Sequence, residues 1–135
     1  MEIARQYALL STCLFTYVGA IIVNPVTNRI ISHGYNGVDS GKVHCCDIND
    51  HGMDRALHGA YADRNETHAE MNALIFAKEP VDGAVCYTTV QPCLNCTKHL
   101  SRAGIIRIYY DTPYWRLENE TYHDFLPKTE VIHLI

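Results

Sequence analysis

The chain has 135 residues, a length that suits one domain with a sizeable buried core, so we expect a single domain over residues 1–135. Hydrophobic residues make up 47% of the sequence and charged residues 19%, as in ordinary globular proteins. The net charge of −4 and the scattered lysines and arginines argue against a polynucleotide partner, because such proteins usually carry a basic stripe. A small ligand with one phosphate needs only one or two local cations, which this composition allows.

No membrane association and no secretion are expected. The sequence has no apolar run that approaches the roughly 18 residues of a membrane-spanning helix. Residues 1–5 lack the basic and apolar pattern of a signal peptide. We therefore expect a cytoplasmic protein. In that reducing compartment, metal binding accounts for six cysteines and eight histidines better than disulfides do.

The N-terminal part predicts a short helix followed by a β-hairpin. Apolar residues lie at helical spacing within residues 2–12, at positions Ile3, Tyr7 and Leu10. Residues 16–23 are apolar and rich in β-branched side chains, which indicates a buried strand. Residues 24–28 contain the asparagine and proline signals of a turn, and residues 29–33 predict the returning strand.

Gly34-Tyr35-Asn36-Gly37 follows this hairpin. Glycines on both sides of Asn36 indicate either a plain tight turn or a turn whose backbone approaches another group closely. Residues 38–65 have few apolar runs and many Gly, Asp, Asn and His residues, which predicts a long loop. Long loops inside compact domains are usually functional.

The rest of the chain predicts alternating helices and strands. Apolar and alanine positions indicate a helix over residues 66–78, ended by Pro80. Pro92 opens a second helix through Ser101, and Gly104 ends it. The predicted strands cover residues 84–89, 105–110 and 130–134. This order after a hairpin implies an α/β sandwich with a mixed sheet.

The strongest chemical signal is His68-Ala69-Glu70, answered 25 positions later by Cys93 and Cys96 of Pro-Cys-Leu-Asn-Cys. One histidine and two cysteines supply three zinc ligands, which leaves the fourth position of a catalytic zinc site open. A lone Cys-x-x-Cys is also compatible with a redox pair or with half of a structural zinc site. Neither alternative gives Glu70 a task, so the pattern favours a catalytic zinc ion.

His-x-Glu followed by Pro-Cys-x-x-Cys is the signature of zinc-dependent nucleobase deaminases, in which the glutamate is the general acid/base and not a ligand. Cys93 and Cys96 are three residues apart at the start of a predicted helix, so their thiols share one side, where the helix dipole favours thiolate. Activation of the attacking water is what the zinc supplies. Glu70 would move the proton to ring N3 and then to the departing amine, as C4 of a cytosine ring is attacked.

The chain resembles the deoxycytidylate deaminases of phage type, a cytosine nucleotide branch of the cytidine deaminase-like superfamily. The likeness covers most of the domain, in the segments 17–22, 34–37, 68–73, 92–96 and 109–114. The zinc motif is specific for deamination, and Gly-Tyr-Asn-Gly points to this branch. The resemblance implies a three-layer α/β/α sandwich with a five-stranded mixed sheet, usually assembled as a homo-hexamer. It also implies hydrolytic deamination of deoxycytidine monophosphate (dCMP) to deoxyuridine monophosphate (dUMP) and ammonia, which supplies dUMP for thymidylate synthesis.

The same resemblance implies roles for residues outside the zinc motif. Asn36, Tyr110 and Tyr114 would contact the substrate. A regulatory site would use Gly34, Tyr35, Asn36 and Gly37. Its activator would be deoxycytidine triphosphate (dCTP) with Mg²⁺, and its inhibitor thymidine triphosphate (dTTP).

A second zinc ion is also implied by the resemblance to the phage enzymes. Its four ligands would be Cys13, Cys45, His58 and Glu66. Four ligands form a closed structural site, which would fix the long loop to the first and the catalytic helices. Cys46 is an alternative ligand. The alternative without a metal is a buried Cys13 beside a solvated polar loop.

Two other functions remain open from the sequence. The first is the same chemistry on a nucleoside or on an RNA base, although the acidic balance and the Gly-Tyr-Asn-Gly segment favour a mononucleotide. The second is a non-catalytic zinc protein that senses nucleotides. Glu70 argues against this sensor, because a binding module needs no acid/base beside an open metal position.

Overall fold

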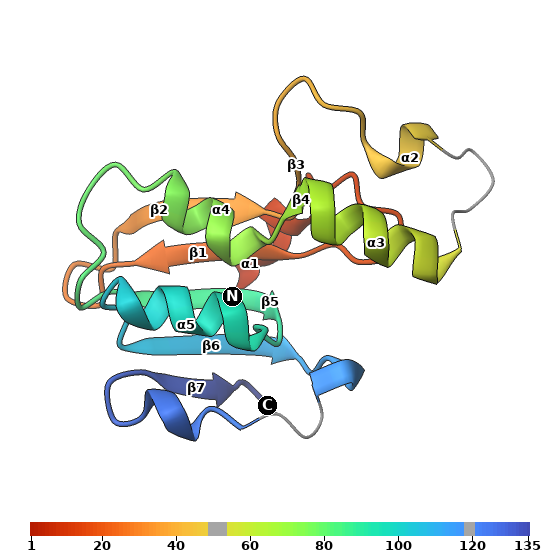
Figure 1. The fold of residues 1–135 in the computed structure, drawn as a ribbon. Coiled ribbons are helices and arrows are strands. Elements are labelled where there is room, and N and C mark those ends of the chain that lie inside the picture. Colours follow the sequence, from red (N-terminus) through yellow and green to blue (C-terminus); the bar gives the residue numbers. More distant parts are fainter. Residues whose placement is uncertain (49–53, 118–120) are drawn as a thin grey trace.

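A computed structural model describes residues 1–48, 54–117 and 121–135 of the chain (Figure 1). The α-helices are α1 (Glu2–Ala8), α2 (Cys45–Ile48), α3 (Arg55–Asn65), α4 (Ala69–Ile75) and α5 (Leu94–Arg102). The strands are β1 (Gly19–Val23), β2 (Ile30–Tyr35), β3 (Gly37–Val38), β4 (Glu66–Thr67), β5 (Val85–Val90), β6 (Arg107–Thr112) and β7 (Glu130–His133). Two short 3₁₀ helices are η1 (Trp115–Leu117) and η2 (His123–Phe125).

Five strands form one mixed sheet in the order β2-β1-β5-β6-β7. β1 runs antiparallel to both of its neighbours, whereas β5, β6 and β7 are parallel to one another. The parallel pairs need crossover connections, which α5 and the segment containing η2 provide. The predicted five-stranded mixed sheet is confirmed.

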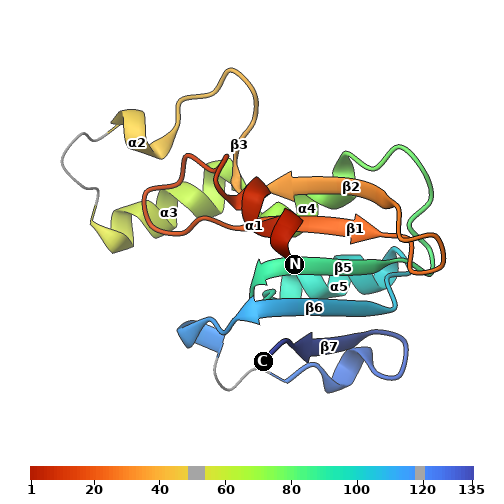
Figure 2. The same ribbon diagram turned by 180° about the vertical axis from the view of Figure 1, so that it is seen from behind.

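Helices cover both faces of this sheet (Figures 1 and 2). α4 and α5 pack side by side on one face, and α1 lies on the other against β1. The main apolar core fills the space between the sheet and the α4–α5 layer. It consists of Ala20, Ile22, Ala69, Ala73, Val81, Ala84, Cys86, Leu100, Ile105 and Ile108. The predicted three-layer arrangement is therefore confirmed.

α1 is shorter than predicted, and it buries a different face. It ends at Ala8, and its buried residues are Ala4 and Ala8, whereas Ile3 is exposed. The reason is the small residue opposite it in β1: a side-chain carbon on Gly19 would clash with the carbonyl oxygen of Ala4. Because helix and strand backbones touch directly, only alanine fits between them, and the larger apolar side chains lie outside this contact.

Gly34 makes a similar close contact on the opposite face of the sheet. Gly34 and Tyr35 belong to β2 and Gly37 to β3, so the predicted turn is reduced to the single residue Asn36. A side-chain carbon on Gly34 would clash with the backbone of Ala69 in α4. Of the two alternatives that the sequence left open, the structure shows the close backbone approach, and its partner is the helix that carries the catalytic motif.

The segment 38–65, predicted as a long loop, contains the end of β3 and the whole of α2 and α3. β3 pairs with β4, so Glu66 and Thr67 are extended and α4 begins at Ala69 rather than at residue 66. α3 covers 11 residues, and Asp54 caps its start, because the Asp54 carboxylate accepts hydrogen bonds from backbone N–H groups of the first turn. Only His58 of α3 is buried, so this helix lacks the apolar stripe from which helices are recognised.

The remaining predicted elements are confirmed within a few residues of their expected ends. The hairpin turn has Asn28 at a φ of 57°, a conformation that asparagine tolerates. α5 ends before Gly104, whose φ of 98° suits glycine alone. Among the helices of the described residues, none has the length and apolarity needed to cross a membrane.

The contact at Gly34 yields a stability prediction with a built-in control. We expect Gly34→Ala to lower the free energy of unfolding by about 1–3 kcal/mol or more, because the new methyl group pushes α4 away from β2. Gly37→Ala is the matched control, since nothing lies within 4 Å of its added carbon. Urea denaturation of both variants measures the difference, and equal stabilities would show that the Gly34 contact imposes no constraint.

Candidate active site

The three predicted zinc ligands meet where two helices begin. His68 precedes α4, Cys93 is the N-cap of α5, and Cys96 lies in its first turn. The Nδ1 atom of His68 lies 3.6 Å from Sγ of Cys93 and 3.4 Å from Sγ of Cys96. The Cys93 sulfur also accepts a hydrogen bond of 3.3 Å from the backbone N–H of Cys96. The spacing of the motif thus brings one imidazole and two thiols together, as the sequence predicted.

This donor set fits a zinc ion. With Zn–S and Zn–N bonds of about 2.3 and 2.0–2.1 Å, two donors of a tetrahedral site are roughly 3.5 Å apart. The observed sulfur–nitrogen distances of 3.4 and 3.6 Å match that value. All three donor atoms lie within 4.8 Å of one another. Three ligands leave the fourth position open for water or substrate.

Hydrogen bonds make Cys93 the stronger acid of the two thiols. The bond from the Cys96 side chain, followed by that from His68, lowers the pKa of Cys93 to about 4 against the effect of burial. The bond to Cys93, together with burial, raises the pKa of Cys96. The same contact with Cys93 raises the pKa of His68 to about 9. This environment favours the thiolate form of Cys93, the form in which a cysteine binds zinc.

Glu70 lies in the first turn of α4 and is only 4% exposed. It lines the same cavity as His68 and Cys93. Burial raises the pKa of Glu70 to about 7. A carboxyl group whose pKa lies near neutrality both accepts and returns a proton easily, which is what a general acid/base requires.

The cavity has a volume of about 190 Å³ and extends from this site along α3, the start of α4, the segment between β5 and α5, and η1. Asn36 and Tyr114, two of the three predicted substrate contacts, line it. Tyr110 does not, because its ring stacks on His133 with the ring centroids 4.9 Å apart.

Asn36 connects β2 to the segment before β1. Its side-chain oxygen accepts a hydrogen bond from the backbone N–H of Val18 at 2.8 Å, and its amide nitrogen donates to the carbonyl of Thr16 at 2.9 Å. One N–H and one lone pair of the amide remain for another partner. Within the predicted regulatory segment, Gly34 and Asn36 thus make internal contacts, while Tyr35 is 39% exposed.

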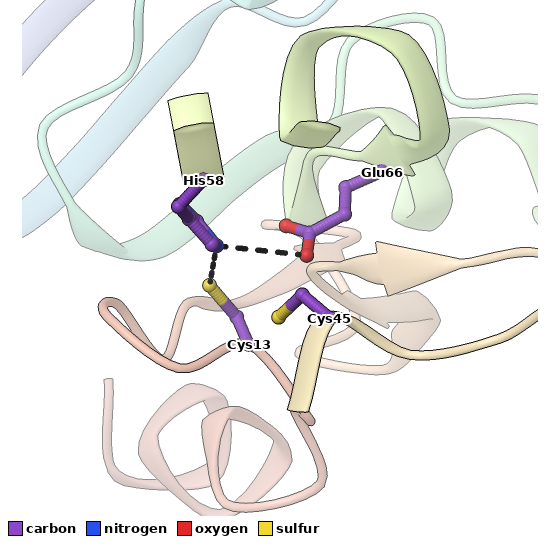
Figure 3. A group of neighbouring side chains, drawn as sticks. All are labelled: Cys13, Cys45, His58 and Glu66. Atoms are coloured by element: carbon purple, nitrogen blue, oxygen red, sulfur yellow. Dashed lines mark hydrogen bonds and ion pairs between the residues drawn. The ribbon is translucent and has the colours of Figure 1, made fainter. Parts of the chain in front are cut away.

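The four residues of the predicted second metal site also lie together (Figure 3). They are Cys13, Cys45, His58 and Glu66, and their donor atoms all lie within 4.8 Å of one another. Nε2 of His58 lies 3.2 Å from Sγ of Cys13 and 3.8 Å from Oε1 of Glu66. Burial raises the pKa of Cys13, and it raises that of Cys45 to about 11. Two thiols, an imidazole and a carboxylate form a closed donor set that suits zinc.

Cys46 lies outside this cluster, although the sequence left it open as a ligand. Its sulfur is 3.9 Å from Oδ1 of Asp47. The four clustered residues come from the segment after α1, from α2, from α3 and from β4. They therefore join elements that share few apolar contacts.

Two arginines that the sequence analysis did not single out line the cavity, Arg55 and Arg116. Arg55 is the first residue of α3, the helix that the periodicity failed to predict. Asp54, a strong N-cap residue directly before it, was the available signal for that helix. Arg116 lies two positions after Tyr114, which the resemblance had already marked.

Comparison with known proteins agrees with this geometry. Residues 1–112 match the family model described as the cytidine and deoxycytidylate deaminase zinc-binding region. The deoxycytidylate deaminase of Enterobacteria phage T4 is 31% identical over 149 residues, which cover 84% of this chain and 76% of the phage protein. ComE operon protein 2 of Bacillus subtilis is 40% identical, with 84% of this chain covering 58% of that protein.

Among solved structures, the dCMP deaminase of the cyanophage S-TIM5 in complex with dCMP and dUMP superposes with a TM-score of 0.77. The identity is 28%, and the match covers 98% of this chain and 92% of the cyanophage chain. The family match spans the whole constellation of His68, Glu70, Cys93 and Cys96. The chain therefore belongs to the family of zinc-binding cytidine and deoxycytidylate deaminases.

Proposed function

We propose that residues 1–135 form one dCMP deaminase domain, which hydrolyses dCMP to dUMP and ammonia and so supplies dUMP for thymidylate synthesis. The observation that carries the proposal is the shared cavity, which places a buried acid/base beside a three-ligand metal site. The phage T4 relative is a deoxycytidylate deaminase, and the cyanophage enzyme was crystallised with dCMP and dUMP. Both likenesses support the choice of substrate.

In this mechanism, His68, Cys93 and Cys96 would hold a zinc ion, which would supply Lewis-acid activation of the attacking water. Glu70 takes one proton from the water and delivers it to ring N3. It then takes the second proton, from the hydroxyl group added at C4, and passes it to the departing amine, so that ammonia leaves as the C4 carbonyl forms. Burial raises the pKa of the Glu70 carboxyl group to about 7, so neither proton transfer is strongly uphill. We assign substrate contacts to Asn36, through its remaining amide groups, and to Tyr114, since both residues line the cavity.

Ammonia release from dCMP by the zinc-loaded protein tests this proposal directly. We expect turnover of dCMP, and we expect Glu70→Ala to lower it by about 10²–10⁴-fold, because the general acid/base is lost. Zinc content, measured on the same samples, should stay at the wild-type level, since Glu70 is not a ligand. Retention of more than a few per cent of the activity would remove Glu70 from its role. Absence of dCMP turnover in the wild type would overturn the function itself and favour the nucleotide sensor.

We also propose that Cys13, Cys45, His58 and Glu66 hold a second, structural zinc ion. The clustering of four suitable donors supports this site. We expect zinc analysis to find one equivalent for each cluster, and Cys45→Ala to lose the second equivalent. Cys46→Ala is the matched control, because its thiol lies outside the cluster and its loss should leave the zinc content unchanged. A single equivalent in the wild type would contradict the second site.

The segment from Gly34 to Gly37 is the proposed site of regulation. We propose that dCTP with Mg²⁺ activates the enzyme and that dTTP inhibits it, through a site that includes Gly34, Tyr35, Asn36 and Gly37. Two contacts support a link from this segment to the catalytic helix. Gly34 touches the backbone of α4, and Asn72 of α4 donates a hydrogen bond of 2.8 Å to the carbonyl of Tyr35. A shift of the segment would therefore move the helix that carries Glu70.

The same ammonia assay, repeated with each triphosphate and Mg²⁺, tests this regulation. We expect activation by dCTP and inhibition by dTTP, each by a factor of about 5 to 150, the usual range of allosteric coupling. Rates that respond to neither nucleotide would discard the regulatory site and keep the enzyme.

The assembly and location follow from the same resemblance. We propose a homo-hexamer that works in the cytoplasm on small nucleotides, without a polynucleotide or membrane partner. The six cysteines are all free thiols, which suits a reducing compartment.

A further inference from the structure

The cavity combines several carboxylates with a small number of cations. Asp63, Glu66 and Glu70 line it, and each negative charge there disfavours a phosphate. Among the described residues, the only lysine or arginine side chains in the lining are Arg55 and Arg116. An anionic nucleotide that enters this cavity has these two guanidinium groups as its available partners.

Each of these arginines lies over an aromatic ring. The guanidinium carbon of Arg55 lies 5.2 Å from the ring centre of Phe15, and that of Arg116 lies 5.0 Å from the ring centre of Trp115. A cation–π contact of this kind does not use up the N–H donors of the guanidinium group. Those donors have the geometry that binds two phosphate oxygens at once.

Arg55 and Arg116 have no carboxylate partner among the described residues, unlike three other arginines of the chain. Arg5 pairs with Asp111 at 2.9 Å, Arg29 with Glu79 at 3.5 Å, and Arg107 with Glu130 at 3.1 Å. Within the described part of the chain, no ion pair neutralises the charge of Arg55 or Arg116.

Their positions match the polarity of a nucleotide. α3 and η1, which carry the two arginines, lie at the same end of the molecule, beyond the carboxyl ends of β5 and β6 (Figures 1 and 2). Both arginines are exposed, whereas Glu70 is buried deeper in the same cavity. A mononucleotide carries its base at one end and its phosphate at the other, so a base beside Glu70 leaves the phosphate near the exposed opening.

We propose that Arg55 and Arg116 bind the 5′-phosphate of the substrate from two sides of the cavity, and so make the enzyme prefer the nucleotide to the nucleoside. This assignment rests on the proposed function and names residues for the phosphate. Neither arginine takes part in the chemical step. Both are specificity residues.

The test compares dCMP with deoxycytidine, which lacks the phosphate, in Arg55→Gln, Arg116→Gln and the double variant of the zinc-loaded protein. For each single variant we expect the ratio of kcat/KM for dCMP to kcat/KM for deoxycytidine to fall about 10- to 100-fold, the usual effect of one charge-assisted hydrogen bond. The double variant should lose most of the preference. Arg116→Lys should recover part of it, because lysine keeps the charge but not the two-pronged geometry.

Arg64→Gln is the matched control, since this exposed residue belongs to the same helix as Arg55 but does not line the cavity. Its substrate ratio should equal that of the wild type. A ratio that stays unchanged in the double variant would overturn the assignment while leaving the deaminase intact. An equal loss on both substrates would also overturn it, because that result indicates structural damage. Failure of the wild type to act on dCMP is a different outcome, which removes the proposed function first.

Discussion

The active site depends on the direct contact between the backbone of β2 and that of α4. Gly34 has no side chain, so the strand approaches Ala69 more closely than any other residue type would allow. Ala69 lies between His68 and Glu70 in the sequence. The contact with Gly34 therefore sets how far both functional residues lie from the sheet. Asn72 reinforces the same junction through its hydrogen bond to Tyr35. Backbone packing thus fixes the position of the helical turn that carries the acid/base.

The catalytic constellation could be predicted from sequence because its information is local. His68 and Glu70 lie two positions apart, Cys93 and Cys96 three apart, and each pair begins a helix. The sheet was predictable for a related reason, since its central strands are short apolar runs between clear turn signals. Periodicity does not show that the two helix starts adjoin, which the zinc motif and the resemblance implied. The resemblance also implied a five-stranded mixed sheet, but the strand order β2-β1-β5-β6-β7 became known only from the structure.

The wrong predictions concern elements in which tertiary contacts, rather than apolar periodicity, decide the structure. α3 has one buried residue, His58, so apolar periodicity carries no trace of it. Ile3 and Leu10 suggested an amphipathic α1, but the contact with Gly19 admits only small side chains. Arg55 was not predicted as a site residue, because no sequence pattern distinguishes a single exposed arginine. Its place in the cavity lining is known only from the structure.

The cluster of Cys13, Cys45, His58 and Glu66 has a further consequence, for how the chain can vary. Most of the domain is specified by apolar burial around the sheet, where a change of one methylene group is felt by its neighbours. α2 and α3 contribute no residue to this core, and each places one donor atom in the cluster, Cys45 from α2 and His58 from α3. Connections between such donors can lengthen or shorten at small entropic cost without disturbing the core. α3 also lines the cavity. This side of the cavity can therefore change to fit a new substrate, while the catalytic residues His68, Glu70 and Cys93 stay the same.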